Sequence, residues 1–270
     1  VERQKRVGTI QDSGFHNTNT KGEAGRTPQI SVIMPVYNGE KYIAQAVQSV
    51  YAQNIPLELI VIDDGSVDGT REVLIPWENR PDFVYIKNER NLGAAGSRNR
   101  GVSVAKGRYV AFLDADDWWE NGKLLLQLDT LHETGRVLCS TGRELMNYDG
   151  TPAGKYIPVK ETVSYRDLLK HNSINCSSVL LLRDVAAEFP MEHDDSHEDY
   201  LTWLKILRKY GPAAGIDRPL LKYRMSKTSK SGDKKKSAIM TYKVYRYMGY
   251  SHMHCILYFI SYAIHGFWKY

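Results

Sequence analysis

The residues best suited to chemistry are three carboxylates in the stretch Asp114-Ala115-Asp116-Asp117. They follow a short apolar run, 109–113, that is typical of a buried strand in a parallel sheet. Carboxylates this close together repel one another unless something neutralises them. A divalent cation that holds a phosphorylated ligand would do so, because hard cations prefer carboxylate oxygens. The alternative is an acidic, solvated turn that leads into a helix.

A second pair of carboxylates, Glu198-Asp199, directly precedes an apolar stretch at helical spacing. A carboxylate in this place could act as a general base that takes a proton from a hydroxyl group. However, Glu and Asp in the first turn of a helix are also stabilised by the helix dipole and need no other role. Taken alone, the pair favours this helix-dipole interpretation.

Alternating strands and helices must position these carboxylates. Apolar, β-branched runs predict the strands, and apolar residues at helical spacing predict the helices between them. Such alternation predicts an α/β fold with a mostly parallel, Rossmann-like sheet flanked by helices. The predicted strands of this half are 30–36, 57–62, 83–86 and 109–113, and the predicted helices are 43–51, 70–74 and 94–105.

Beyond the acidic stretch the chain alternates less regularly. Turn residues between 147 and 163 predict an irregular excursion or a hairpin, and Ser164 with Asp167 resembles a capping box for a short helix. The other predicted elements are a helix at 123–133, strands at 137–141 and 178–182, a helix at 200–210 and extended chain at 213–223.

Polar residues follow three of the predicted strands. Tyr37-Asn38 comes after the first strand, Asp64 after the second and the Asp114 stretch after the fourth. Ligands of open parallel sheets bind beyond the carboxyl ends of the strands, so we expect these residues at one site. The Tyr37 ring could stack on a base. Asp64 could accept a hydrogen bond from a ring N–H or a ribose hydroxyl.

A glycine-rich segment at 91–101 predicts a helix start that a ligand can approach closely. Arg98 lies within this segment and could contact the ligand. Surface solvation is the alternative for Arg98, and it is our expectation for Arg100.

Four stretches together resemble family 2 of the inverting glycosyltransferases, which have the GT-A fold. They are 31–38, 58–66, 91–101 and 112–118, and the resemblance extends from residue 30 to about residue 224. It implies a GT-A catalytic domain at 30–226. It also implies transfer of a hexosyl or N-acetylhexosaminyl group from a nucleoside-diphosphate sugar, with a UDP-sugar as the expected donor. The acceptor would be a glycan or a lipid-linked sugar, as in enzymes of bacterial surface-polysaccharide synthesis.

The resemblance also implies roles for single residues. Asp114 would face the ribose and Asp116 would bind Mn²⁺ or Mg²⁺ on the diphosphate. Asp117 could support that site from behind, but the sequence does not decide this role. Asp199 would be the general base, and Glu198 would touch the acceptor or orient the loop, so the resemblance reverses the helix-dipole interpretation. The residues that it places around the nucleotide are Pro35, Tyr37, Asn38, Glu40, Asp64, Asn91, Arg98, Asp114 and Ala115.

Three further polar residues precede the predicted base. We expect Asp194 and Asp195 to be solvated. His197 could contact the acceptor, although a single His in a loop is more often solvated.

The C-terminal region, 227–270, combines a basic loop with a helical extension rich in Tyr. Around the start of this loop, Arg224, just before it, or Lys227 could meet phosphate, or the loop could be solvated. Tyr, Trp and flanking Lys favour the interfacial zone of a bilayer. We therefore expect one or two amphipathic helices that rest on the inner membrane face or dock a lipid-linked acceptor. Packing of these helices on the catalytic domain or on a second subunit, as in a homo-oligomer, is the alternative.

Composition narrows the class of protein. The formal net charge of +5 is modest and does not indicate nucleic acid as a partner. Three cysteines without metal-ligand spacing indicate reduced thiols in a cytoplasmic protein. No signal peptide is visible, and the longest apolar run, around 255–264, is too short to span a bilayer. The polar residues 1–29 predict a flexible leader.

Two other functions compete with sugar transfer. A haloacid-dehalogenase-like phosphatase also places Asp-x-Asp after a strand, but after the first one, whereas this motif follows the fourth and precedes Trp118-Trp119. A nucleotide-sugar-binding module without catalysis would not need the Glu198-Asp199 pair. The identity of the sugar depends on the region 138–175, which contains no readable motif.

Overall fold

The computed structural model describes residues 28–225 and 234–267. The first four strands are β1 (Ile30–Val36), β2 (Leu57–Asp63), β3 (Phe83–Lys87) and β4 (Tyr109–Phe112). They pair in the order β3-β2-β1-β4, and every pair is parallel. This confirms the predicted parallel sheet and brings the carboxyl ends of the four strands to one edge.

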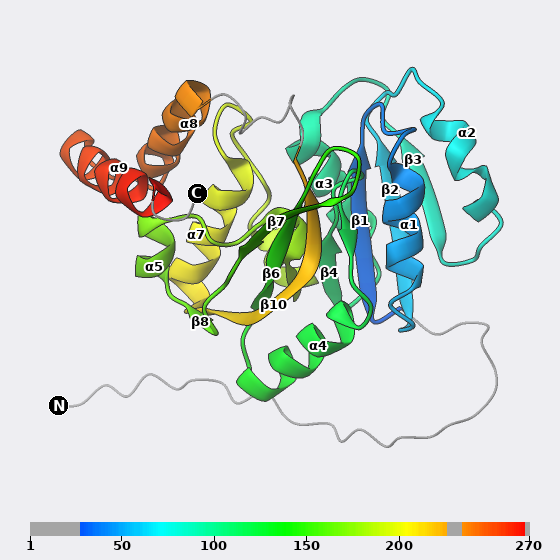
Figure 1. The fold of residues 1–270 in the computed structure, drawn as a ribbon, viewed down its shortest axis with the longest axis horizontal. Coiled ribbons are helices and arrows are strands. Elements are labelled where there is room, and N and C mark those ends of the chain that lie inside the picture. Colours follow the sequence, from blue (N-terminus) through cyan, green and yellow to red (C-terminus); the bar gives the residue numbers. More distant parts are fainter. Residues whose placement is uncertain (1–27, 226–233, 268–270) are drawn as a thin grey trace.

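Helices cover both faces of this sheet (Figure 1). The connecting helices are α1 (Ile43–Tyr51), α2 (Thr70–Leu74), the short 3₁₀ helix η1 (Ile75–Trp77) and α3 (Gly93–Val104). Because neither face of the central strands is open to water, β2 is buried along its whole length, and its residues are apolar except for Glu58 and Asp63.

The second half of the chain completes the sheet. Its elements are β5 (Trp118–Trp119), α4 (Lys123–Thr134), β6 (Leu138–Met146), β7 (Pro152–Ile157), β8 (Thr162–Val163), α5 (Tyr165–Lys170), η2 (Cys176–Ser178), β9 (Leu180–Leu182), α6 (Arg183–Glu188), α7 (Glu198–Tyr210) and β10 (Ala213–Arg224). The strand order continues β4-β9-β6-β10-β5. Strand β9 runs antiparallel to β4 and β6, whereas β10 runs parallel to β6.

Some details of this half confirm the sequence prediction, and others differ from it. Strands β6 and β7 form an antiparallel pair, so the region after residue 147 contains a hairpin. The capping box at Ser164 and Asp167 is confirmed. The predicted strand 178–182 is shortened at its start by η2, and the sequence pattern missed α6 and the two-residue β5. These are elements of two to six residues, too short to show a periodicity of their own.

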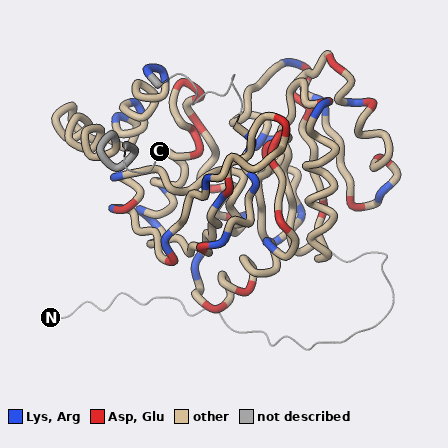
Figure 2. Tube along the Cα trace, viewed as in Figure 1, with Lys and Arg blue, Asp and Glu red and all other residues tan. Residues whose placement is uncertain are grey.

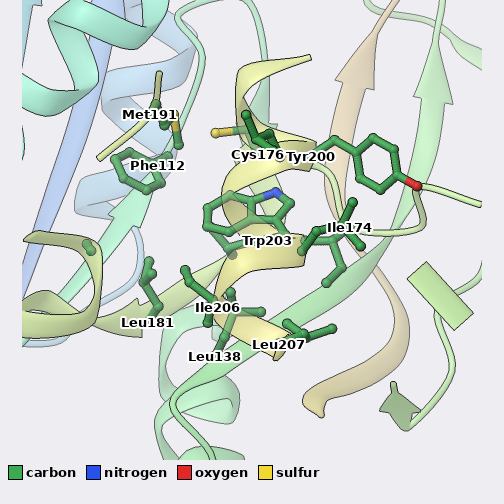
Figure 3. Close-up of a cluster of buried hydrophobic side chains, with 14 of the residues drawn as sticks. Phe112, Leu138, Ile174, Cys176, Leu181, Met191, Tyr200, Trp203, Ile206 and Leu207 are labelled. Atoms are coloured by element: carbon green, nitrogen blue, oxygen red, sulfur yellow. The ribbon is translucent and has the colours of Figure 1, made fainter. Parts of the chain in front are cut away.

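Two hydrophobic clusters hold the layers together. One lies between the sheet and α1 and α4, and the other lies on the opposite face, against α3, α6 and α7. Trp203 of α7 is fully buried in the second cluster, surrounded by Phe112, Cys176 and Ile206 (Figure 3). The centroids of the Trp203 and Phe112 rings are 6.4 Å apart. This contact fixes α7 against the strand that precedes the acidic stretch.

The C-terminal helices α8 (Lys234–Tyr247) and α9 (His252–Phe267) pack on α5 and α7. Val244 and Cys255 are buried in the same cluster as Trp203. One side of the helix pair α8 and α9 therefore packs on the catalytic domain, which was the alternative to membrane contact. Residues 1–27, 226–233 and 268–270, with most of the predicted leader and basic loop, lie outside the described residues. In the described part of the chain, no helix has the length and apolar character that a membrane crossing requires.

Candidate active site

The acidic stretch forms a tight turn at the end of β4. The Asp117 N–H donates to the Asp114 carbonyl at 3.0 Å, which directs the three carboxylates into a small volume. Asp117 is buried, and its Oδ1 accepts from the Arg224 N–H at 2.9 Å. Burial, followed by the charges of Asp116 and Asp114, raises the pKa of Asp117 well above its usual range. Asp117 therefore supports the turn from inside the protein.

The charge of Asp116 is only weakly compensated within the described residues. Burial and then the charge of Asp114 raise its pKa to about 6, while Arg224 acts weakly in the opposite direction. No side chain among the described residues donates a hydrogen bond to this carboxylate, so a cation would stabilise its charged form.

Arg98 joins the acidic stretch to helix α7. Its Nη2 lies 2.5 Å from Asp114 Oδ1, and its Nη1 lies 3.4 Å from Glu198 Oε1. Arg98 and Glu198 are both buried, with 6% and 8% of their side chains exposed. The solvation alternative for Arg98 is therefore wrong. The guanidinium brings the two groups of carboxylates that the sequence singled out into one place.

Asp199 follows Glu198 in the first turn of α7. Its Oδ1 accepts from the Tyr200 N–H at 2.7 Å. Burial, and then the charge of Glu198, raise the pKa of Asp199, whereas His197 and Arg98 oppose the rise. A raised pKa makes this carboxylate a stronger base than a solvated Asp.

The residues after β1 and β2 hold each other in position. Asn38 has a left-handed backbone with φ of 53°. Its N–H donates to Ser66 Oγ at 2.9 Å, and its Oδ1 accepts from the Val67 N–H at 3.0 Å. Glu40 accepts from the Gly69 N–H at 2.5 Å. Next to these anchored residues Tyr37 is 55% exposed, so a ligand can reach its side chain.

Asp64 orders the glycine-rich segment. Its Oδ1 accepts from Asn88 Nδ2 and from the Leu92 N–H, both at 2.7 Å, and its Oδ2 accepts from the Gly93 N–H at 2.8 Å. Asn91 Nδ2 donates to the Asp64 carbonyl at 3.2 Å. Asp64 thus builds the start of α3, a role that the sequence pattern missed. The signal was the polar Asn88 directly after β3.

Four polar residues make contacts that their sequence predictions did not include. Arg100 is not merely solvated, because it donates to the Lys87 carbonyl and to Asn88 Oδ1. Arg224 is buried, and its guanidinium donates to the carbonyls of Asp116 and Tyr148 and to Gln45 Oε1, which contradicts a solvated loop at this position. The other two, Asp195 and His197, hold helix α8, as described below.

The metal-binding capacity of the protein alone is small. Among residues 28–225 and 234–267, no group of three or more His, Cys, Asp or Glu side chains could hold a metal ion. A cation at Asp116 would therefore take most of its ligands from a phosphorylated ligand and water, which is usual for Mg²⁺.

The fold and the site define a glycosyltransferase with the GT-A fold: an acidic turn follows the fourth parallel strand, and a carboxylate pair on a facing helix adjoins it. The model of the family "Glycosyl transferase family 2" matches residues 31–188. The chain belongs to this family.

Relatives cover almost the whole chain. It is 39% identical over 239 residues to the putative teichuronic acid biosynthesis glycosyltransferase TuaG of Bacillus subtilis (strain 168), covering 87% of this chain and 95% of the relative. It is 33% identical over 241 residues to WfaP of Escherichia coli, a UDP-Glc:alpha-D-GlcNAc-diphosphoundecaprenol beta-1,3-glucosyltransferase, covering 89% and 94%.

Solved structures share the fold at low identity. S. aureus TarS 1–349 in complex with UDP-GlcNAc matches with a TM-score of 0.65 at 21% identity, covering 80% of this chain and 65% of that chain. The mannosyltransferase PcManGT from Pyrobaculum calidifontis, in complex with GDP-Man and Mn²⁺, matches with a TM-score of 0.65 at 19% identity, covering 87% and 70%. These likenesses support the GT-A architecture.

Proposed function

We propose that this glycosyltransferase moves a hexosyl or N-acetylhexosaminyl group from a UDP-sugar to a lipid-linked acceptor in surface-polysaccharide synthesis. The contact of Arg98 with both Asp114 and Glu198 supports this most directly, because it joins the proposed donor site to the residue that precedes the proposed base, Asp199. The relative WfaP, whose name gives UDP-Glc as the donor and a diphosphoundecaprenol-linked sugar as the acceptor, supports the choice of substrates. Such an acceptor would place the enzyme at the inner face of the membrane.

The nucleotide would lie along the carboxyl edge of β1, β2 and β4. Tyr37 would stack on the uracil, and Asp114 would face the ribose. Base–aromatic stacking is worth about 1–3 kcal/mol, so one exposed ring supplies a large share of the binding. The remaining proposed nucleotide contacts are Pro35, Asn38, Glu40, Asp64, Asn91, Arg98 and Ala115.

The residues at the acidic turn fit a divalent cation on the diphosphate. Asp116 has a raised pKa and no side-chain donor among the described residues, so it offers an oxygen ligand in need of positive charge. A bound Mn²⁺ or Mg²⁺ would neutralise the departing diphosphate. Asp117, buried behind it, would keep the turn in the geometry that presents Asp116.

Asp199 would take the proton of the acceptor hydroxyl. As that oxygen forms its bond to the anomeric carbon, the bond from this carbon to the diphosphate oxygen breaks, with inversion at the carbon. The proton moves to the Asp199 carboxylate, and UDP leaves with the electron pair of the broken bond. Glu198, fixed by Arg98, would hold the start of α7 so that Asp199 faces the acceptor.

Membership of the family excludes the phosphatase alternative. A screen of UDP-glucose, UDP-galactose and their N-acetyl forms tests the proposal. With a lipid-diphosphate-linked N-acetylglucosamine as acceptor, we expect metal-dependent UDP release with one donor. If UDP release is independent of the acceptor for every donor tested, the proposed transfer is contradicted.

A further inference from the structure

Helix α9 carries an apolar face that the described residues leave open. Its other side is packed: Cys255 is buried, and the Tyr258 ring lies 4.9 Å from the Tyr250 ring. The open side presents four residues that are 50–72% exposed, at intervals of three and four along one helix face. We call this surface the α9 stripe, and it consists of Met253, Ile256, Leu257 and Ile260. Figure 1 shows α9 at the outer edge of the molecule.

The segment that carries helices α8 and α9 has charges of one sign only. No Asp or Glu occurs between residues 234 and 270, whereas this segment contains five Lys and one Arg. Helix α8 carries positive charge, and the described part of α9 carries no Lys, Arg, Asp or Glu (Figure 2). A second copy would bring the same positive segment against this one, which disfavours self-association. An anionic surface complements both the apolar stripe and the basic helix beside it.

Helix α8 is tied to the loop that leads to the proposed base. Asp195 Oδ2 accepts from Lys243 Nζ at 2.6 Å and from the Tyr247 hydroxyl at 3.0 Å. The His193 ring stacks on the Tyr247 ring, with centroids 3.7 Å apart. His197 Nε2 lies 3.1 Å from Ser237 Oγ. A surface that binds helices α8 and α9 would therefore also position the loop that ends at Glu198 and Asp199.

We propose that the α9 stripe lies on the surface of an anionic lipid bilayer and thereby holds the loop before Asp199 close to that surface. The helix lies in the interface and does not cross it, in keeping with its length and with its packed inner side. The use of this contact, to meet a lipid-linked acceptor, rests on the proposed function. The contact itself needs neither donor nor acceptor.

Vesicle co-sedimentation of the full chain tests the contact. The probes are vesicles with equal parts of phosphatidylglycerol and phosphatidylcholine, and vesicles of phosphatidylcholine alone. The test variant is Leu257→Asp, and the matched control is Leu125→Asp on α4; the two leucines are 58% and 51% exposed. Met253→Asp, at a residue that is 72% exposed, is a second test variant. Circular dichroism checks that each variant is folded.

We expect binding to the anionic vesicles, weaker binding at high salt and little binding to phosphatidylcholine alone. Leu257→Asp and Met253→Asp should weaken binding at least about tenfold, because an apolar side chain is replaced by a charge that lipid repels. Leu125→Asp should bind like the wild type. Absence of binding by the full chain, or an equal loss in Leu125→Asp, would overturn the proposal. So would a lipid-free dimer, seen by analytical ultracentrifugation, that Leu257→Asp dissociates.

Sugar transfer to a soluble acceptor distinguishes failure of the proposed lipid contact from failure of the proposed function. Transfer without vesicle binding would refute only the lipid contact. Vesicle binding without transfer from any donor would refute only the proposed reaction.

Discussion

Replacement of Arg98 by Met tests whether this guanidinium holds the two halves of the site together. Met keeps most of the length of the side chain but removes the charge. Asp114, Glu198 and Asp199 would then lack the guanidinium that lies among them. We expect a large loss of stability, because buried carboxylates that lose their countercharge are strongly destabilising.

The magnitude follows from burial. Only 8% of the Glu198 side chain is exposed, against 35% for Asp114, so Glu198 carries most of the desolvation cost. Breaking a buried ion pair costs about 3–5 kcal/mol. Adding Glu198→Gln to Arg98→Met should restore part of this loss by removing a buried charge. Adding Asp114→Asn should restore less, because water already reaches Asp114.

Equilibrium unfolding in urea measures these free energies. The matched control is Arg80→Met, because Arg80 also pairs with a carboxylate, at 2.9 Å to both oxygens of Asp82, but 46% of its side chain is exposed. An exposed pair contributes only about 0–1 kcal/mol. A loss for Arg98→Met within about 1 kcal/mol of the loss for Arg80→Met would refute the reasoning.

Three further predictions concern the donor site and the core. Asp116→Ala should remove the Mn²⁺-dependent part of UDP binding in calorimetry, and an unchanged metal dependence would exclude Asp116 as a ligand. Tyr37→Ala should weaken UDP binding by about 1–3 kcal/mol, whereas Tyr210→Ala, an exposed tyrosine at the end of α7, should not; equal effects would rule out stacking. Burial lowers the pKa of Lys123 to about 7 from 10.5, so between about pH 7 and pH 10 the Lys123 amine is protonated in the unfolded state but not in the folded state. As the pH rises through this window, the wild type should therefore gain stability relative to Lys123→Met by about 1.4 kcal/mol per pH unit, measured by unfolding in urea. A difference in unfolding free energy that does not change with pH would contradict a buried neutral amine.

The first half of the fold could be predicted because its local signals agree. β1 is confirmed at Ile30–Val36, and α1 spans the predicted apolar stripe from Ile43 to Tyr51. The direction of β9 could not be predicted, because three apolar residues, Leu180–Leu182, show neither a period nor a partner. Its antiparallel pairing depends on tertiary contacts with β4 and β6.

The site could also be predicted in part from the sequence. Residues that follow parallel strands must share an edge, so Tyr37, Asp64 and the Asp114 stretch could be grouped from strand order alone. The contact of Arg98 with Glu198 joins residues 100 positions apart, and no local pattern shows it. The role of Asp195 was likewise hidden, since its partners, Lys243 and Tyr247, belong to a helix whose position depends on packing.

The central claim is that Asp199 takes the proton of the acceptor. Asp199→Asn keeps the shape of the side chain and removes its basicity, and Asp194→Asn, an exposed residue of the same loop, is the control. We expect Asp199→Asn to lower the rate of sugar transfer by at least about 10²–10⁴-fold while UDP binding stays within a few-fold of the wild type. Asp194→Asn should transfer sugar normally. Turnover by Asp199→Asn close to that of the wild type would contradict the account.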